Sequence, residues 1–127
     1  MTQKEMNEYH RLVKERDGFD VTPSIKGYGK GILMPVNLDE KKVAHKLKIF
    51  SELALMKYCP RERLPTYLQF VKVVKANYEV EYGYVYYITF YAKDPSAGDG
   101  CISTFQAKVW DAISKIEVQL VRPKAYA

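Results

Sequence analysis

The chain has 127 residues, 47% of them hydrophobic, which is enough for one domain with a buried core. Its 20 Lys and Arg against 15 Asp and Glu leave a formal charge of +5, and this mild excess is typical of a solvated surface rather than of a nucleic-acid footprint. No apolar run is long enough to cross a bilayer, so we expect no membrane partner. The charged start, Met1 to Glu8, lacks the apolar core of a secretory signal, so we expect a cytoplasmic or otherwise intracellular protein.

The first part of the chain predicts a helix followed by a loop. Residues 2–17 carry a capping-box pattern and a partial apolar stripe at helical spacing, and Gly18 is a plausible helix stop. From residue 19 to residue 31, Pro and Gly interrupt any periodicity, which indicates a loop. The short apolar run over 32–36 predicts a strand, and its Pro35 favours the edge of a sheet.

The clearest helical pattern begins at Asn37. Asn37 is a favourable N-cap, and Glu40 lies at the third helical position. Helical spacing then places one broad apolar stripe along the segment, made of Val43, Leu47, Ile49, Phe50, Leu53, Ala54 and Met56. Because proline disfavours helical geometry in the residue before it, we predict that Cys59-Pro60 ends the helix.

After Pro65 the sequence predicts strands. Leu68–Val74 and Tyr84–Tyr91 are rich in β-branched and aromatic residues, and Thr104–Trp110 and Ile116–Leu120 alternate between apolar and polar residues. Turn-forming residues occupy the connection after the second of these strands. The helix and the sheet can bury their apolar faces if the helix packs across one face of a curled antiparallel sheet, so we predict an α+β fold.

Three blocks of the sequence resemble the cystatins, most closely the plant branch of that family, the phytocystatins. Leu68–Ala76 resembles the family's second strand, Gly83–Thr89 the stretch after its first inhibitory loop, and Ala107–Trp110 its fourth strand. This resemblance implies one long helix packed on a curled antiparallel sheet of four to five strands. It places a cystatin-like domain over residues 27–127, after an N-terminal extension with a helix over residues 1–26.

Cystatins block papain-like cysteine proteases by filling the cleft with three segments. These are a glycine-bearing trunk, a first hairpin with the pattern Gln-x-Val-x-Gly, and a second hairpin carrying Pro-Trp. The resemblance assigns the trunk to Gly29, with Gly27 and Gly31 as alternatives, and the second hairpin to Ile113 and Ser114. It assigns the first hairpin to five consecutive residues, namely Glu79, Val80, Glu81, Tyr82 and Gly83.

The resemblance therefore implies a non-catalytic protease inhibitor without cofactor or metal, in which inhibition is weakened by departures from the family pattern. Only Gly83 fits the first hairpin's pattern, and the aromatic residue of the second hairpin is missing. Glu81 stands in place of valine, and an unpaired carboxylate is costly to desolvate in an apolar cleft. Tyr82 offers an aromatic anchor in partial compensation, at a tip that we expect to point outward.

Other functions stay open. The same scaffold suits a non-inhibitory module that binds another protein, and the tyrosines between Tyr78 and Tyr91 suggest stacking of nucleic-acid bases, although the mild charge disfavours it. Long strands also favour a homodimer formed by strand exchange. Cys59 and Cys101 pair with no histidine at a catalytic spacing, so we predict no enzyme, and their redox state is left open.

Overall fold

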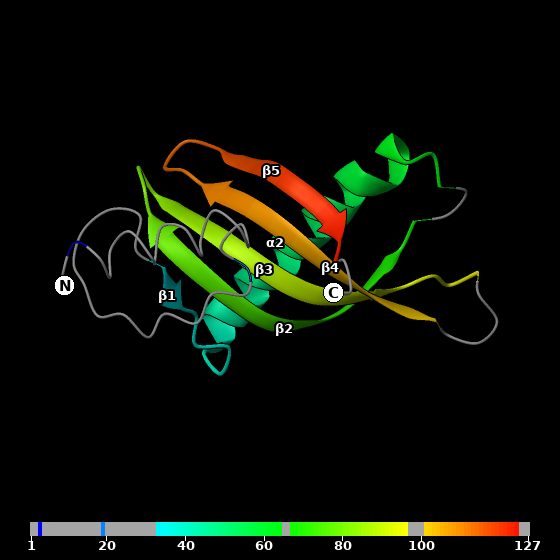
Figure 1. Ribbon diagram of the computed structural model, residues 1–127, viewed down its shortest axis with the longest axis horizontal. Coiled ribbons are helices and arrows are strands. Elements are labelled where there is room, and N and C mark those ends of the chain that lie inside the picture. The colour runs from blue at the N-terminus through cyan, green and yellow to red at the C-terminus, as the bar shows by residue number, and fades with distance from the viewer. Residues whose placement is uncertain (1–2, 4–18, 20–32, 65–66, 97–100, 125–127) are drawn as a thin grey trace.

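A computed structural model shows one helix packed on a five-stranded antiparallel sheet (Figure 1), which confirms the α+β class. The structure describes residues 3, 19, 33–64, 67–96 and 101–124. The strands follow one another across the sheet in chain order, β1 to β5. In chain order the elements are β1 (Met34–Pro35), α2 (Lys41–Arg61), β2 (Gln69–Val80), β3 (Tyr84–Lys93), β4 (Ile102–Asp111) and β5 (Ile116–Pro123).

Several predictions for the first part of the chain lie outside the described residues. Of the predicted helix over residues 2–17 the structure describes only Gln3, and of the predicted loop over residues 19–31 only Phe19. Gly29, the predicted trunk glycine, is also outside the described residues. The predicted edge strand is present at Met34–Pro35, where it pairs with the C-terminal part of β2.

The predicted N-cap of the long helix is wrong. Helix α2 begins at Lys41, its N-cap is Glu40, and no side chain caps it. Asn37 lies before the helix, where its Oδ1 accepts a 3.0 Å hydrogen bond from the amide of Asp39. The asparagine side chain thus closes a local turn instead of capping the helix. Short polar side chains can form either kind of hydrogen bond with a nearby backbone amide.

The predicted helix end at Cys59-Pro60 is also wrong. Pro60 lies inside the last turn, and α2 continues to Arg61. Glu62 is the C-cap, and the chain turns away at Arg63, which has a left-handed φ of 55° and whose amide donates to the carbonyl of Pro60. The amide of Leu64 reaches back to the carbonyl of Cys59, which completes a Schellman motif. No helix of the described segments is long and apolar enough to span a membrane.

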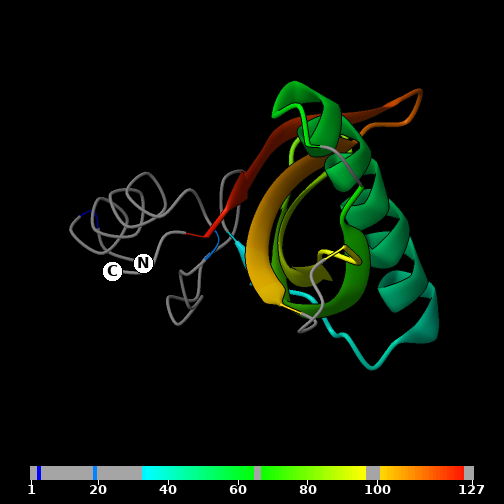
Figure 2. The same ribbon diagram turned by 90° about the vertical axis from the view of Figure 1, so that its right-hand side faces the viewer.

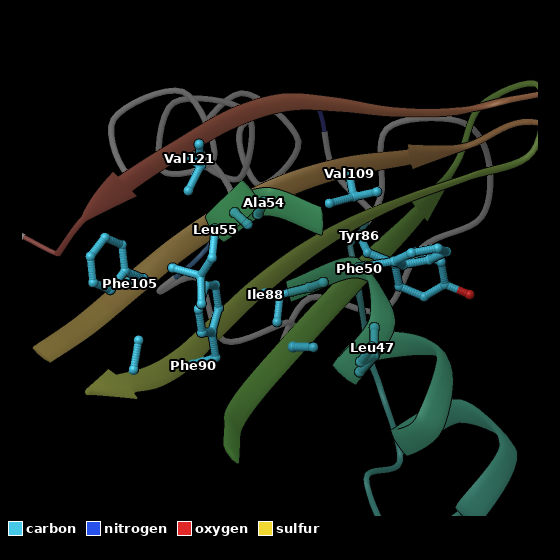
Figure 3. Packing of buried hydrophobic residues seen from close by; sticks show 13 residues of the cluster. Leu47, Phe50, Ala54, Leu55, Tyr86, Ile88, Phe90, Phe105, Val109 and Val121 are labelled. Atoms are coloured by element: carbon cyan, nitrogen blue, oxygen red, sulfur yellow. The ribbon is translucent and has the colours of Figure 1, made fainter. Parts of the chain in front are cut away.

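The main core lies between α2 and the face of the sheet toward it (Figure 3). Side chains of the helix meet side chains of the central strands there, and the labelled members are Leu47, Phe50, Ala54, Leu55, Tyr86, Ile88, Phe90, Phe105, Val109 and Val121. Two register shifts in β2, between Phe70 and Lys72 and between Val73 and Lys75, bend the strand. Figure 2 shows the resulting curved strands in profile, with α2 along their concave side.

A second, smaller cluster covers the other face of the sheet. Its buried members are Phe19, Leu33, Val85 and Tyr87. The ring of Phe19 packs edge-on against that of Tyr87 with centroids 5.5 Å apart, and the guanidinium of Arg122 lies over the Phe19 ring. Phe19 therefore belongs to the folded interior, although it precedes the predicted domain boundary after residue 26.

Strand β2 is longer than the predicted Leu68–Val74, because it runs on to Val80. The added part carries the polar residues Asn77 and Glu79, which pair with Tyr87 and Val85 of β3. Residues directly opposite each other point to the same face of a sheet, so these polar side chains lie on the second face. They are nevertheless buried there.

Candidate functional site

Two turns lie side by side at one end of the sheet (Figure 1). The β2–β3 turn comprises residues 81–83, and the β4–β5 turn comprises residues 112–115. They are neighbours because Tyr84, which begins β3, pairs with Asp111, which ends β4. The turns approach each other so closely that a Cβ on Gly83 would lie 2.3 Å from the carbonyl oxygen of Asp111. Only glycine permits this approach.

The β2–β3 turn directs Tyr82 outward. Tyr82 and Gly83 both have positive φ, 48° and 113°, and the amide of Glu81 closes the turn by donating to the Gly83 carbonyl at 3.0 Å. A left-handed backbone is uncommon for tyrosine. The side chain is 77% exposed, so Tyr82 lies at the outward-pointing end of the hairpin.

The β4–β5 turn presents an aliphatic side chain beside that tyrosine. The amide of Ala112 donates to the carbonyl of Lys115 at 2.9 Å, which closes the turn. Between them, Ser114 is exposed and Ile113 is 100% exposed. Ile113 and Ser114, the predicted second-hairpin residues, are therefore both at the surface, at the same end as Tyr82.

Exposed apolar side chains continue from the turns onto the flanking strands. Met34 lies at this end because it pairs with Tyr78, two residues before Val80. We call the following exposed residues the apolar tip: Met34, Val80, Tyr82, Tyr84, Ile113 and Ile116. Contiguous exposed apolar surface is typical of interaction sites in soluble proteins.

Two of the predicted site residues are not seen at the tip. Gly29 is outside the described residues. Glu79 is only 8% exposed, and its Oε1 accepts a 2.7 Å hydrogen bond from the hydroxyl of Tyr87. The structure therefore brings together Val80–Gly83 with Ile113 and Ser114, whereas Glu79 lies beneath them in the second face of the sheet.

Trp110 links the β2–β3 turn to strand β4, a role that sequence reasoning did not assign to it. Its Nε1–H donates to the carbonyls of Glu81, at 3.1 Å, and Tyr82, at 3.2 Å. The Nζ of Lys115 lies 5.2 Å from the centre of the indole. Trp110 is the chain's one tryptophan and lies just before a turn, which was the available signal.

A hollow of about 330 Å³ opens beside the tip on the second face of the sheet. Its walls are formed by the β2–β3 turn and by strands β3, β4 and β5. The lining residues are Glu81, Tyr82, Val85, Lys108, Trp110 and Gln119. Lys108 is turned toward the sheet, with its Nζ 5.5 Å from the centre of the Tyr87 ring. Aromatic, charged and amide side chains thus line one hollow beside the β2–β3 turn.

Most charges near the tip are paired, but that of Glu81 is not. Lys46 of α2 contacts Asp111 at 3.3 Å, and Lys115 contacts Glu117 at 3.4 Å. Among the residues that the structure describes, Glu81 forms no ion pair, and its side chain is exposed. A partner that covers the tip must therefore desolvate this carboxylate.

Tyr86 lies below the tip on the helix side of the sheet, and its environment favours the neutral phenol. Burial raises the pKa of Tyr86 above its ordinary value of 10.0, and the carboxylate of Asp111 raises it further, as do Tyr84 and Tyr78 when they are ionised. Its ring is 7% exposed, and that of Tyr87 is 4% exposed. The central tyrosines of β3 thus contribute to the two cores rather than to an exposed stacking surface.

The described residues include both cysteines of the chain. Cys59 is buried and Cys101 is exposed, and the two do not form a disulfide. The Sγ of Cys59 accepts a hydrogen bond from the amide of Leu68 at 3.4 Å. No group of three or more His, Cys, Asp or Glu side chains within the described ranges is placed to hold a metal ion.

The tip is thus formed by two adjacent turns with exposed apolar side chains. Its main polar feature is the exposed carboxylate of Glu81, which forms no ion pair with any other described residue. Comparison of the sequence with protein-family models and with curated proteins finds no match.

Proposed function

We propose that this protein is a non-catalytic, cystatin-like binder of papain-like cysteine proteases, whose apolar tip enters the protease cleft and covers the catalytic thiol. The observation that supports the proposal most is the position of Tyr82 and Ile113. These two exposed side chains lie on adjacent turns at the same end of one sheet. Two such turns make a narrow edge of the kind that fills a cleft.

The backbone of the tip is held before any partner arrives, which favours binding by occlusion. The β2–β3 turn is closed by its own hydrogen bond and is contacted by Trp110. A preformed edge loses little conformational freedom on binding, so more of the contact energy contributes to affinity. An aromatic residue such as Tyr82 is the residue type most often found at the energetic centre of an interface.

The carboxylate of Glu81 weakens the proposed binding. It is exposed beside Tyr82 and would face the interior of the cleft. Desolvating an unpaired carboxylate costs several kcal/mol, on the order of 3–5. Since about 1.4 kcal/mol corresponds to a factor of ten in affinity, we expect micromolar rather than nanomolar inhibition of papain.

The proposal is tested by titrating papain with the purified full-length protein and following its residual activity on a small peptide substrate. We expect activity to fall at micromolar protein. Two variants at the tip, Tyr82→Ala and Ile113→Asp, each raise the inhibition constant about tenfold or more, because each removes apolar contact area from the edge.

Matched controls lie at the opposite end of the sheet. Tyr67 is 60% exposed before β2, and Ile102 is 54% exposed at the start of β4. The variants Tyr67→Ala and Ile102→Asp therefore make the same chemical changes away from the tip and leave inhibition unchanged. Full papain activity at tens of micromolar wild-type protein would overturn the proposal and leave a non-inhibitory interaction module.

A further inference from the structure

The indole of Trp110 contacts both turns of the tip. Its single N–H is shared between two carbonyl oxygens of the β2–β3 turn, those of Glu81 and Tyr82. Its ring lies under the ammonium group of Lys115, which belongs to the β4–β5 turn. One side chain of β4 therefore spans the two adjacent turns.

One of the two carbonyls that accept from Trp110 belongs to Tyr82, whose backbone is left-handed, and the other belongs to the residue before it. Tyr82 has a φ of 48°, a region in which a side chain with a Cβ is strained. The neighbouring Gly83 lies so near β4 that a Cβ on it would be 2.3 Å from the carbonyl oxygen of Asp111. The indole N–H supplies a donor to oxygens that this unusual conformation turns toward the second face.

We propose that Trp110 is a positioning residue that holds the β2–β3 turn in its left-handed conformation and fixes it relative to the β4–β5 turn. The consequence for affinity rests on the proposed function. If the tip enters a cleft, a turn that samples other conformations presents Tyr82 correctly for only part of the time. The apparent affinity then falls by that fraction.

The first measurement uses the free protein and needs no protease. In Trp110→Phe, which keeps an aromatic ring but loses the N–H, the amide of Glu81 should exchange with solvent at least tenfold faster than in the wild type. Amides of the central strand, such as those of Ile88 and Phe90, should keep their exchange rates. Tyr67→Phe, an aromatic change far from the tip, serves as the control. An unchanged Glu81 rate would overturn the proposal.

A second measurement stays decisive even if the variant folds poorly. The wild type has one tryptophan, so its indole N–H gives a single, unambiguous signal in a nitrogen-correlated proton spectrum. We expect this proton to exchange at least tenfold more slowly than that of a free indole. Exchange at the free rate would show that the two hydrogen bonds are not maintained, and would overturn the proposal.

The third measurement separates the positioning role from the proposed function. Against papain, Trp110→Phe should raise the inhibition constant about three- to tenfold, mainly through a slower association rate, while the free energy of unfolding of the core changes little. If the wild type does not inhibit at all, the proposed function fails, and the two exchange measurements still decide the role of Trp110. If the wild type inhibits and Trp110→Phe inhibits equally well, the positioning role fails alone.

Discussion

The hydroxyl of Tyr87 donates a 2.7 Å hydrogen bond to Oε1 of Glu79, and both side chains are buried on the sheet face away from α2. The two residues come from neighbouring strands, β2 and β3, just below the β2–β3 turn. The hydroxyl gives the buried carboxylate a partner that solvent cannot supply there. The pair therefore lies beneath the turn, whereas the resemblance to cystatins predicts Glu79 at the binding surface.

Tyr87→Phe should lower the free energy of unfolding by about 1–3 kcal/mol, because it leaves the buried Glu79 carboxylate without this donor. The measurement is urea unfolding followed by circular dichroism. Tyr84→Phe removes the same hydroxyl from a residue that is 45% exposed, and should change stability by less than about 0.5 kcal/mol. Equal effects of the two variants would contradict the buried pair.

Gly83→Ala should lower the free energy of unfolding by more than the 1–3 kcal/mol or so expected from its positive φ alone. The reason is the Asp111 carbonyl oxygen, which a Cβ would meet at 2.3 Å. Ser114→Ala in the adjacent turn is the control and should be nearly neutral, because Ser114 is exposed. A loss below about 0.5 kcal/mol for Gly83→Ala would show that the turns can separate without cost.

Glu81→Val should strengthen inhibition of papain about tenfold or more, since it replaces a carboxylate that must be desolvated with an apolar side chain. The measurement is the inhibition constant of the variant relative to the wild type. Glu52→Val makes the same change on the exposed side of α2 and should leave inhibition unchanged. Weaker inhibition by Glu81→Val would show that the carboxylate meets a positive group in the cleft.

The stability of the fold should fall as the pH rises above about 10, in part because of Tyr86. Burial and the nearby negative groups raise the pKa of Tyr86 in the folded protein above its value in the unfolded chain. Its contribution is complete below pH 10 or so, and is lost as the pH rises toward the folded pKa. Tyr86→Phe should reduce this loss in denaturant titrations at alkaline pH. An identical pH dependence would contradict the raised pKa.

The outer edge of β5 is covered by two cations of α2, and their removal should promote self-association. Lys57 Nζ donates to the carbonyl of Val118 at 2.7 Å, and Nη2 of Arg61 donates to that of Val121 at 2.8 Å. Because β5 is the edge strand, these carbonyls would otherwise be available to another strand.

In sedimentation experiments, a Lys57→Ala/Arg61→Ala double variant should therefore associate at lower concentrations than the wild type. A Lys42→Ala/Lys48→Ala double variant removes equal charge from the same helix and should behave as the wild type. Identical sedimentation of all three proteins would show that the two side chains do not protect the edge. This comparison also bears on the predicted homodimer by strand exchange.

The long helix and the long strands could be predicted from the sequence because their signals are local. Apolar residues recur along α2 at helical spacing, and β-branched and aromatic residues fill β3. The ends of the helix were not predictable in the same way. Asn37 suits both a cap and a turn, and Pro60 is tolerated in a last turn that a Schellman motif closes at Arg63.

By itself, then, the sequence determined that one helix with a broad apolar face precedes a set of antiparallel strands, because periodicity and turn chemistry are properties of neighbouring residues. Only the tertiary structure decided what each residue of the candidate site does. Glu79 is buried on the second face, where the hydroxyl of Tyr87 from the neighbouring strand reaches it diagonally, and Trp110 holds the turn because the strands bring it to Glu81 across 29 positions of the chain. Such contacts depend on strand register and sheet curvature, which no local pattern encodes.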